Sequence, residues 1–295
     1  MALTSLIRKM PRVALVFALL AFTDIGAARA SLLDSDIAKN LQPHRAVYNI
    51  KMVKRHDGAQ VQNISGQMTY EWKRDCDAWV TNHHFKLAYE YPGAPVLNIV
   101  SDFSTYEPFD GQSLSFTSRR AREGDLYEEL RGNASLGPDG GGKALYNIPS
   151  ELKFNLSKGT LFPMMHTLAL LDSIEKGNKF FHAVVFDGSD DEGPVEINAI
   201  TSRRLDAGKD TALSPKIDDK LLRGPAWNVR LAFFPVRGTE AISDYEMNAV
   251  IHRNGIISDM RVDYKDFSVT QKLVALERLK NTVCGRAIDT PLNSH

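Results

Sequence analysis

The sequence lacks an excess of charge of either sign and, beyond its first thirty residues, any long hydrophobic run. Lysine plus arginine and aspartate plus glutamate number 36 each, so the formal net charge is zero. This balance gives no electrostatic basis for binding nucleic acid and offers no polybasic segment for an anionic membrane. No later stretch approaches the roughly 18 apolar residues of a transmembrane helix, so we expect no membrane anchor in the mature chain.

The motifs of common catalytic and metal sites are also missing. The chain has no G-x-S-x-G, G-x-G-x-x-G, P-loop or H-E-x-x-H. Ser150 and Lys153 match S-x-x-K, but the companion K-T-G and S-D-N elements are absent, so we reject that motif. We therefore predict no catalytic residue, no cofactor and no metal site. An envelope hydrolase stays open only if distant strands bring Ser, His and Asp together in a cleft.

The first thirty residues have the three regions of a secretory signal peptide. Basic residues in 8–12 precede an apolar run over 13–22 that is too short to span a bilayer, and the small-x-small tripeptide ARA ends at Ala30. We predict cleavage between Ala30 and Ser31. The remainder, residues 31–295, should form a single periplasmic domain.

Cysteine is scarce, with only Cys76 and Cys284 in the chain. Disulfides persist in the periplasm and are rare in a reducing cytosol, so two cysteines in an exported chain predict one intramolecular bridge. In the chain-entropy model, closing so long a loop contributes on the order of 5 kcal/mol. Two buried free thiols or an intermolecular pair are the alternatives. Neither cysteine lies in C-x-x-C, which disfavours a redox role.

Period-two alternation dominates what is present. In residues 79–91, Trp79, Thr81, His83 and Phe85 share one face of a predicted strand. Similar runs occur at 97–103, 113–119, 180–186, 196–203 and 227–233. We therefore predict a mainly antiparallel β protein.

The C-terminal part carries the strongest local signal. Asn254 and Gly255 stand between two alternating runs, which predicts a type I′ hairpin. The run from Phe267 leads toward Cys284, so we expect the second cysteine to end the last strand.

One segment, residues 160–176, predicts a helix. Thr160 is a suitable N-cap, Pro163 falls in the first turn, and Gly177 follows as a stop. Apolar residues recur near helical spacing, so the helix should be amphipathic or wholly buried. We expect it against the concave side of a curved sheet.

Two polar groups invite a functional interpretation. Four carboxylates stand within residues 187–192, the density of oxygen ligands that calcium prefers, but the segment fails the EF-hand pattern and an Asp/Gly-rich turn is favoured. Cation binding at this turn stays open. His83 and His84 are adjacent in a strand and must point to opposite faces. His166, on the helix, is the candidate histidine, although a satisfied interior histidine is the commoner outcome.

Aromatic and methionine residues could line a lipid-sized concavity or simply fill the core. Core filling is favoured because a domain of this size needs such residues inside. The candidates are Trp72, Trp79, Phe162, Met164, Met165, Phe180, Phe181, Trp227, Phe233 and Phe234.

Several short motifs together resemble the EipB family, periplasmic cell-envelope integrity proteins of Gram-negative alphaproteobacteria. They are D-C-D-x-W ending at Trp79, L-F-P-x-M-H-T opening the helix, V-F-D-G-S-D-D from Val185, and a final strand followed by Cys284. The resemblance spans residues 44–284, essentially the whole mature chain.

The resemblance implies a large antiparallel sheet coiled as a β-spiral or open barrel, broadly similar in shape to the LolA and LolB lipoprotein carriers. It also implies a helix associated with the sheet, a disulfide between Cys76 and Cys284, a role in envelope stress resistance and no catalytic residues. A periplasmic tetratricopeptide-repeat partner is implied as well. We therefore expect a non-enzymatic interaction scaffold, with a carrier of lipid or lipoprotein acyl chains as the alternative.

Overall fold

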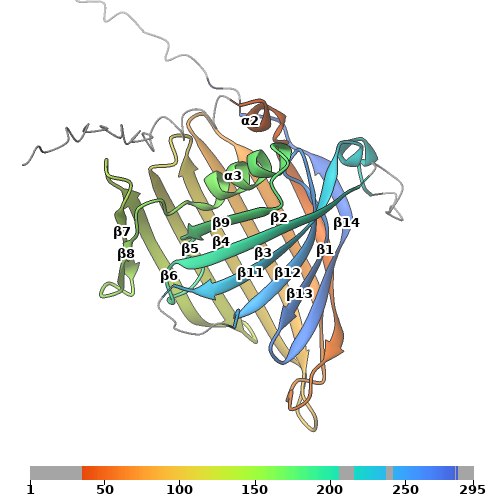
Figure 1. Ribbon diagram of the computed structural model, residues 1–295. Coiled ribbons are helices and arrows are strands. Elements are labelled where there is room, and N and C mark those ends of the chain that lie inside the picture. The colour runs from red at the N-terminus through yellow and green to blue at the C-terminus, as the bar shows by residue number, and fades with distance from the viewer. Residues whose placement is uncertain (1–34, 206–215, 237–241, 283, 285–295) are drawn as a thin grey trace, which may run out of the picture.

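The computed structural model describes residues 35–205, 216–236, 242–282 and 284. Their architecture is one antiparallel sheet of 14 strands with a principal helix, α3 (Pro163–Glu175), inside its curve (Figure 1). The predicted mainly β, open-barrel fold is confirmed. The predicted signal peptide, residues 1–30, and its cleavage site lie outside the described residues.

The sheet is built from two meanders. The strands are β1 (His44–Arg55), β2 (Asn63–Arg74), β3 (Ala78–Glu90), β4 (Leu97–Pro108), β5 (Ser113–Arg122), β6 (Asp125–Leu136), β7 (Gly142–Ile148), β8 (Lys153–Leu156), β9 (Phe180–Val185), β10 (Val195–Leu205), β11 (Ala226–Pro235), β12 (Tyr245–His252), β13 (Ile257–Tyr264) and β14 (Phe267–Arg278). The first meander runs from β1 to β8, and the second returns from β9 to β14, which pairs with β1. The two edge strands, β8 and β9, are therefore the two strands that flank α3 in the sequence.

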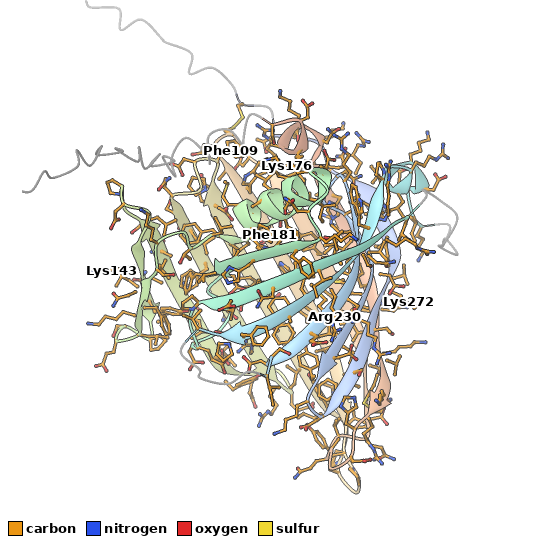
Figure 2. All side chains as sticks on the ribbon, viewed as in Figure 1. Phe109, Lys143, Lys176, Phe181, Arg230 and Lys272 are labelled. Carbon is orange, nitrogen blue, oxygen red and sulfur yellow. A yellow bond between two sulfur atoms is a disulfide. The ribbon has the colours of Figure 1, made fainter. Side chains whose placement is uncertain are left out.

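The ends of this curled sheet differ. Helix α2 (Asp36–Asn40), helix α3 and the β12–β13 turn lie at one end, which we call the helix end (Figure 1). The β1–β2, β3–β4, β5–β6 and β13–β14 connections lie at the opposite end, which we call the hairpin end. Arg230 and Lys272 point away from the curl into solvent (Figure 2). None of the helices described has the length and apolarity that crossing a membrane requires.

Two local predictions need correction. Thr160 is not the N-cap of α3: that position belongs to Phe162, which makes no side-chain cap, while the Thr160 hydroxyl donates to the Ser157 carbonyl at 2.8 Å. The turn after β12 is not type I′, because of its two central residues only Gly255 has a positive φ, 83°. The Gly255 N–H donates back to the His252 carbonyl at 2.9 Å, typical of a type I turn followed by a left-handed glycine.

Aromatic packing, rather than strand pairing, holds β9 against β5 to β8. Phe116, Tyr146, Phe154 and Phe186 form a cluster with ring centroids 4.8 to 6.5 Å apart. Gly188 follows in a left-handed conformation with φ 73°, and a Cβ there would lie 2.3 Å from Cγ of Phe116. The loop after β9 therefore packs so closely on the first meander that only glycine fits.

The predicted disulfide is confirmed. Cys76, in the β2–β3 turn, bonds to Cys284 across a sequence separation of 208, with the Cα atoms 5.5 Å apart. The second cysteine does not end the last strand, since β14 stops at Arg278. The intervening chain crosses to the first meander, where the Thr282 N–H donates to the Arg74 carbonyl at 3.4 Å. The bridge thus ties the segment after the last strand to the second hairpin.

Candidate functional site

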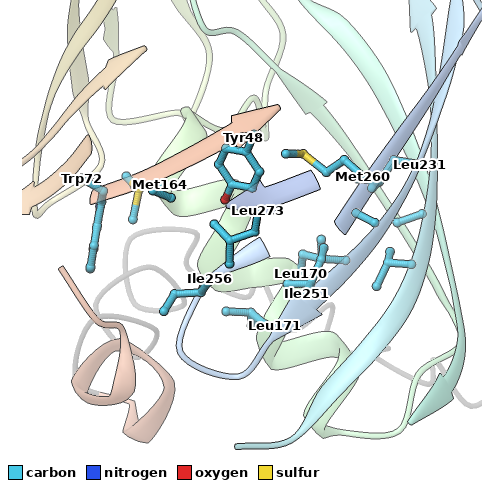
Figure 3. Packing of buried hydrophobic residues seen from close by; sticks show 14 of the residues in the cluster. Tyr48, Trp72, Met164, Leu170, Leu171, Leu231, Ile251, Ile256, Met260 and Leu273 are labelled. Atoms are coloured by element: carbon cyan, nitrogen blue, oxygen red, sulfur yellow. The ribbon is translucent and has the colours of Figure 1, made fainter. Parts of the chain in front are cut away.

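A cavity of about 520 Å³ lies inside the curled sheet. Its wall is formed by β1 to β5 on one side, by β9 to β14 on the other, and by α3 at the helix end. Figure 3 labels Tyr48 and Met260 of the sheet and Met164 of the helix, which all belong to this wall. The volume falls within the roughly 300–1,000 Å³ of pockets that hold small molecules.

Helix α3 is fixed in the wall by a buried carboxylate from the sheet. Glu107, at the end of β4, is 0 % exposed. Its two oxygens accept the backbone N–H groups of Met164 at 2.7 Å and Met165 at 3.0 Å. These are orphan donors of the first helical turn, and a negative charge there also complements the helix dipole. Glu107 therefore supplies the cap that Phe162 does not.

The cavity wall is tightly packed at the helix end and more exposed at the hairpin end. At the helix end its wall residues are fully packed: Leu171 is 1 % exposed, His44 2 % and Trp72 3 %. At the hairpin end the wall includes Tyr264, which is 38 % exposed. A ligand would enter between the hairpin connections.

Most of the wall is aliphatic, aromatic or thioether in character. Residues of these kinds in the wall include Tyr48, Met68, Tyr70, Phe85, Phe103, Met164, Leu170, Ile197, Leu231, Phe233, Met247, Met260 and Val262. Burial raises the pKa of Tyr48, of Tyr70 and of Tyr245, so these phenols stay protonated at neutral pH. Such a surface suits an apolar ligand.

Two histidines in the wall are also uncharged. Burial lowers the pKa of His83 to about 4, and burial likewise lowers the pKa of His166 to about 4. Both rings are therefore neutral at pH 7, because the apolar surroundings disfavour the imidazolium. His166 was the candidate histidine, and it does line the cavity, with its ring 5.7 Å from that of Phe181.

Two charged residues of the cavity wall come from the loop after β9 and from the C-terminal part of β5. The Arg120 guanidinium donates to Glu128 at 2.5 and 2.7 Å and to the Ser189 carbonyl at 2.9 Å. Asp187 accepts the Ser189 N–H at 2.9 Å, and burial raises the pKa of its carboxyl group. Both Arg120 and Asp187 line the cavity. The polar groups of the wall thus offer a carboxyl and a guanidinium to the polar part of a ligand.

The acidic segment 187–192 forms part of the loop between β9 and β10, as the sequence predicted. Asp190 accepts the Glu192 N–H at 2.9 Å, and the Tyr146 hydroxyl donates to the Asp190 carbonyl at 2.7 Å. Within the described part of the chain, no group of three or more His, Cys, Asp or Glu side chains is placed to hold a metal ion. The carboxylates at this loop organise its backbone.

The aromatic and methionine candidates divide between cavity and core. Trp72, Met164 and Phe233 line the cavity. Trp79, Phe162 and Met165 are buried at 2 % exposure or less, whereas Phe180 is 75 % exposed on the edge strand. The remaining candidates, Phe181, Trp227 and Phe234, lie outside the lining.

The period-two alternation of strands identified some wall residues, and the same alternation in other strands would have identified more. The inward face predicted for residues 79–91 is confirmed, because Thr81, His83 and Phe85 line the cavity. His84 points to the opposite face and meets Asp102 at 2.5 Å. Tyr48, Met68 and Tyr70 were not singled out, although residues 44–52 and 64–72 carry the same period of two. Glu107 gave no local signal.

The comparisons with known proteins agree with one another. The family model described as EipB-like matches residues 35–280. The chain is 30 % identical over 242 residues to the cell envelope integrity protein EipB of Brucella abortus, covering 81 % of this chain and 85 % of that protein. It also resembles a crystal structure of a β-barrel-like protein from Brucella abortus, with a TM-score of 0.75, 29 % identity, and coverage of 81 % of this chain and 99 % of that one.

Proposed function

This chain belongs to the EipB-like family, and from that premise we propose that it supports cell-envelope integrity by holding the acyl chain of a lipid or lipoprotein in its cavity. The name of the Brucella relative supports the envelope role. The cavity of about 520 Å³, with its mostly apolar wall, is the observation that carries the acyl ligand. The order of the two functions expected from the sequence is thereby reversed, with the carrier ahead of the scaffold.

The proposal places the mature protein in the periplasm. The basic, apolar and small-x-small regions before Ser31 support export, and the Cys76–Cys284 disulfide suits an oxidising compartment. A non-enzymatic role follows from the same premise, because retention of an acyl chain requires burial of apolar surface and no reacting group.

The wall chemistry suggests how such a ligand would be oriented. Its acyl chain would extend toward α3, where Leu170 and Leu171 are 4 % and 1 % exposed. Its polar end would remain near Arg120 and Asp187, the charged residues of the wall. This orientation leaves the polar end close to solvent and avoids burying unpaired charge.

Ligand analysis after gentle purification tests the proposal. We expect native mass spectrometry to find one acyl-bearing molecule per chain, and a fluorescent fatty acid to bind after delipidation. Met247→Glu, which places a charge in the cavity wall, should weaken binding by about tenfold or more. Met52→Glu is the matched control, because Met52 packs against the same core without lining the cavity. Absence of lipid together with no probe binding by wild type would contradict the proposal.

The interaction scaffold is the second candidate, and the same purification separates it from the carrier. Its expected partner is a periplasmic tetratricopeptide-repeat protein. Capture of such a protein from crosslinked periplasm by both wild type and Met247→Glu, with no acyl chain bound by wild type, would favour the scaffold. Loss of envelope resistance on substituting Met247 but not Met52 would favour the carrier.

A further inference from the structure

Exposed apolar side chains gather at the hairpin end of the curled sheet, where the cavity opens. Val96 is 50 % exposed, Leu126 49 %, Tyr127 48 % and Tyr264 38 %. Val96 ends the β3–β4 loop, in which residues 92–96 read PGAPV, all exposed and without a charge. We call residues 92–96, Leu126, Tyr127 and Tyr264 the rim patch. A soluble protein exposes such side chains singly as a matter of course, whereas a group of them marks an interaction site.

The members of the rim patch come from neighbouring hairpins. The Glu123 N–H donates to the Asn98 carbonyl at 3.0 Å, and the Asn98 N–H donates to a Glu123 carboxylate oxygen at 2.5 Å. These bonds hold the β5–β6 turn, which carries Leu126 and Tyr127, beside the start of β4 and the uncharged loop before it. Residues 92–96, Leu126 and Tyr127 of the rim patch therefore lie on adjacent hairpins.

Tyrosines continue this surface around the opening. Burial raises the pKa of Tyr89 to about 12, and electrostatic interaction with Tyr264, Tyr91 and Tyr127 adds to the rise. Tyr264 also packs 5.0 Å from Phe267 and 5.6 Å from Tyr245, measured between ring centroids. Tyr264 and Tyr245 line the cavity as well. Tyr264 therefore belongs both to the rim patch and to the cavity wall, and its ring contacts connect the two.

The charges around the opening alternate in sign. The β1–β2 connection has Arg55 near Asp57, and the β13–β14 turn has Lys265 next to Asp266. The β5–β6 turn adds Arg122, whose guanidinium lies 5.2 Å above the Tyr127 ring, together with Glu123 and Asp125. Adjacent cations and anions complement headgroups that carry both a phosphate and an amine. They provide no net field that would attract an anionic surface.

We infer that the rim patch docks the protein on a bilayer of zwitterionic phospholipid, with the opening of the cavity facing the lipid. Tyrosine suits this position because its ring packs against acyl chains while its hydroxyl stays among the headgroups. The uncharged loop 92–96 and Leu126 enter the acyl boundary, and the paired charges stay at headgroup level. An acyl chain could then pass between the bilayer and the cavity without crossing water. This inference rests on the proposed acyl ligand for its purpose, while docking itself can be measured separately.

Vesicle flotation with the full mature chain tests docking. We expect wild type to float with phosphatidylcholine and phosphatidylethanolamine vesicles, with little change when salt is raised or phosphatidylglycerol is added. Leu126→Glu should lower the bound fraction by about tenfold, because docking of wild type transfers the leucine side chain from water into the bilayer and the variant loses this transfer. Leu145→Glu is the matched control: Leu145 is 52 % exposed, but it lies on β7, away from the rim patch. Steep salt dependence, or equal losses in the two variants, would overturn the inference.

Depth of insertion gives an independent measurement. Leu126→Trp should be quenched by brominated phosphatidylcholine, whereas Leu145→Trp should not, above the background of the native tryptophans. Size-exclusion chromatography in the absence of lipid completes the test: if Leu126→Glu dissociates an oligomer formed by wild type, the patch joins copies of the chain and the inference fails.

The two proposals can fail separately. If wild type binds the fluorescent fatty acid from solution but does not float, docking is wrong and the acyl ligand stands. If wild type floats but binds no fatty acid, the acyl ligand is wrong and docking stands. Leu126→Glu should retain the fatty-acid affinity of wild type, since Leu126 does not line the cavity.

Discussion

Replacing Glu107 by glutamine perturbs the protein at the contact that fixes α3 in the cavity wall. The substitution preserves size and shape and removes only the negative charge and one acceptor. Glu107 is 0 % exposed and accepts the N–H groups of Met164 and Met165. A glutamine oxygen can accept one of these bonds, but its NH₂ group faces the other N–H with no acceptor to offer.

The magnitude follows from these two hydrogen bonds. A hydrogen bond to a charged group contributes about 1.5–3 kcal/mol, and a buried N–H left unpaired costs about 1–3 kcal/mol. We therefore expect Glu107→Gln to lower the free energy of unfolding by about 2–4 kcal/mol. For a chain of this size that corresponds to a melting temperature lower by roughly 4–7 °C.

Urea unfolding followed by circular dichroism measures the change, and the m-value should stay constant because the fold is retained. Fatty-acid binding should weaken in the same variant, since α3 carries Met164, His166 and Leu170 into the wall.

Glu123→Gln is the matched control for Glu107→Gln. Glu123 also accepts a backbone N–H, from Asn98 at 2.5 Å, but it is exposed on a turn. We expect a change within about 0.5 kcal/mol for this variant. If Glu107→Gln were as stable as Glu123→Gln, the capping role assigned to the buried carboxylate would be wrong.

Three further predictions concern the disulfide, the buried histidines and the loop after β9 that packs on Phe116. Cys76→Ser should lower the free energy of unfolding by about 2–5 kcal/mol, given the separation of 208 residues, and wild-type melting temperatures that are equal with and without reductant would refute this. Burial lowers the pKa of His83 and of His166 from 6.5 to about 4, so between pH 6.5 and 4 only the unfolded chain takes up these protons. The free energy of unfolding should therefore fall by about 1.4 kcal/mol per ring for each pH unit in this range. His166→Phe should reduce this pH dependence, measured by urea unfolding, and an unchanged pH dependence would count against the prediction. Gly188→Ala should cost about 1–3 kcal/mol more than Gly93→Ala, since both have a left-handed φ but only Gly188 faces a ring at 2.3 Å; equal melting temperatures would contradict this.

Local patterns were reliable where neighbours in sequence decide the structure. Alternation over residues 79–91 placed His83 inside and His84 outside because successive side chains in a strand must diverge. Pro163 and Gly177 bracketed the helix, since each has a conformational preference of its own. The same alternation in β1 and β2 was available and was not used.

Sequence patterns of this local kind could not predict contacts between residues far apart in the chain. The cap of α3 comes from a residue 57 positions before Met164, while the nearby Thr160 fitted the local rule and turned inward to Ser157 instead. Asn-Gly alone favours a type I′ turn, but Asn254 is bonded to distant residues: its carbonyl accepts the Gln42 N–H at 3.0 Å, and its side-chain N–H donates to the Leu221 carbonyl at 2.7 Å. The two errors differ in kind, because the contact of Thr160 is local, three residues away, whereas the side-chain contact of Asn254 with Leu221 is tertiary.

The sequence by itself determined the mainly antiparallel β class, the principal helix, the pairing of Cys76 with Cys284 and the resemblance to the family, because period, backbone preference and residue scarcity are local or countable properties. Only the tertiary structure decided that β14 lies beside β1 and that the sheet curls around a cavity with α3 across one end. The loop at Gly188, for example, packs on Phe116, a residue more than 70 positions earlier in the chain. A cavity is the space that such packing leaves between residues far apart in the chain, so no single segment encodes it.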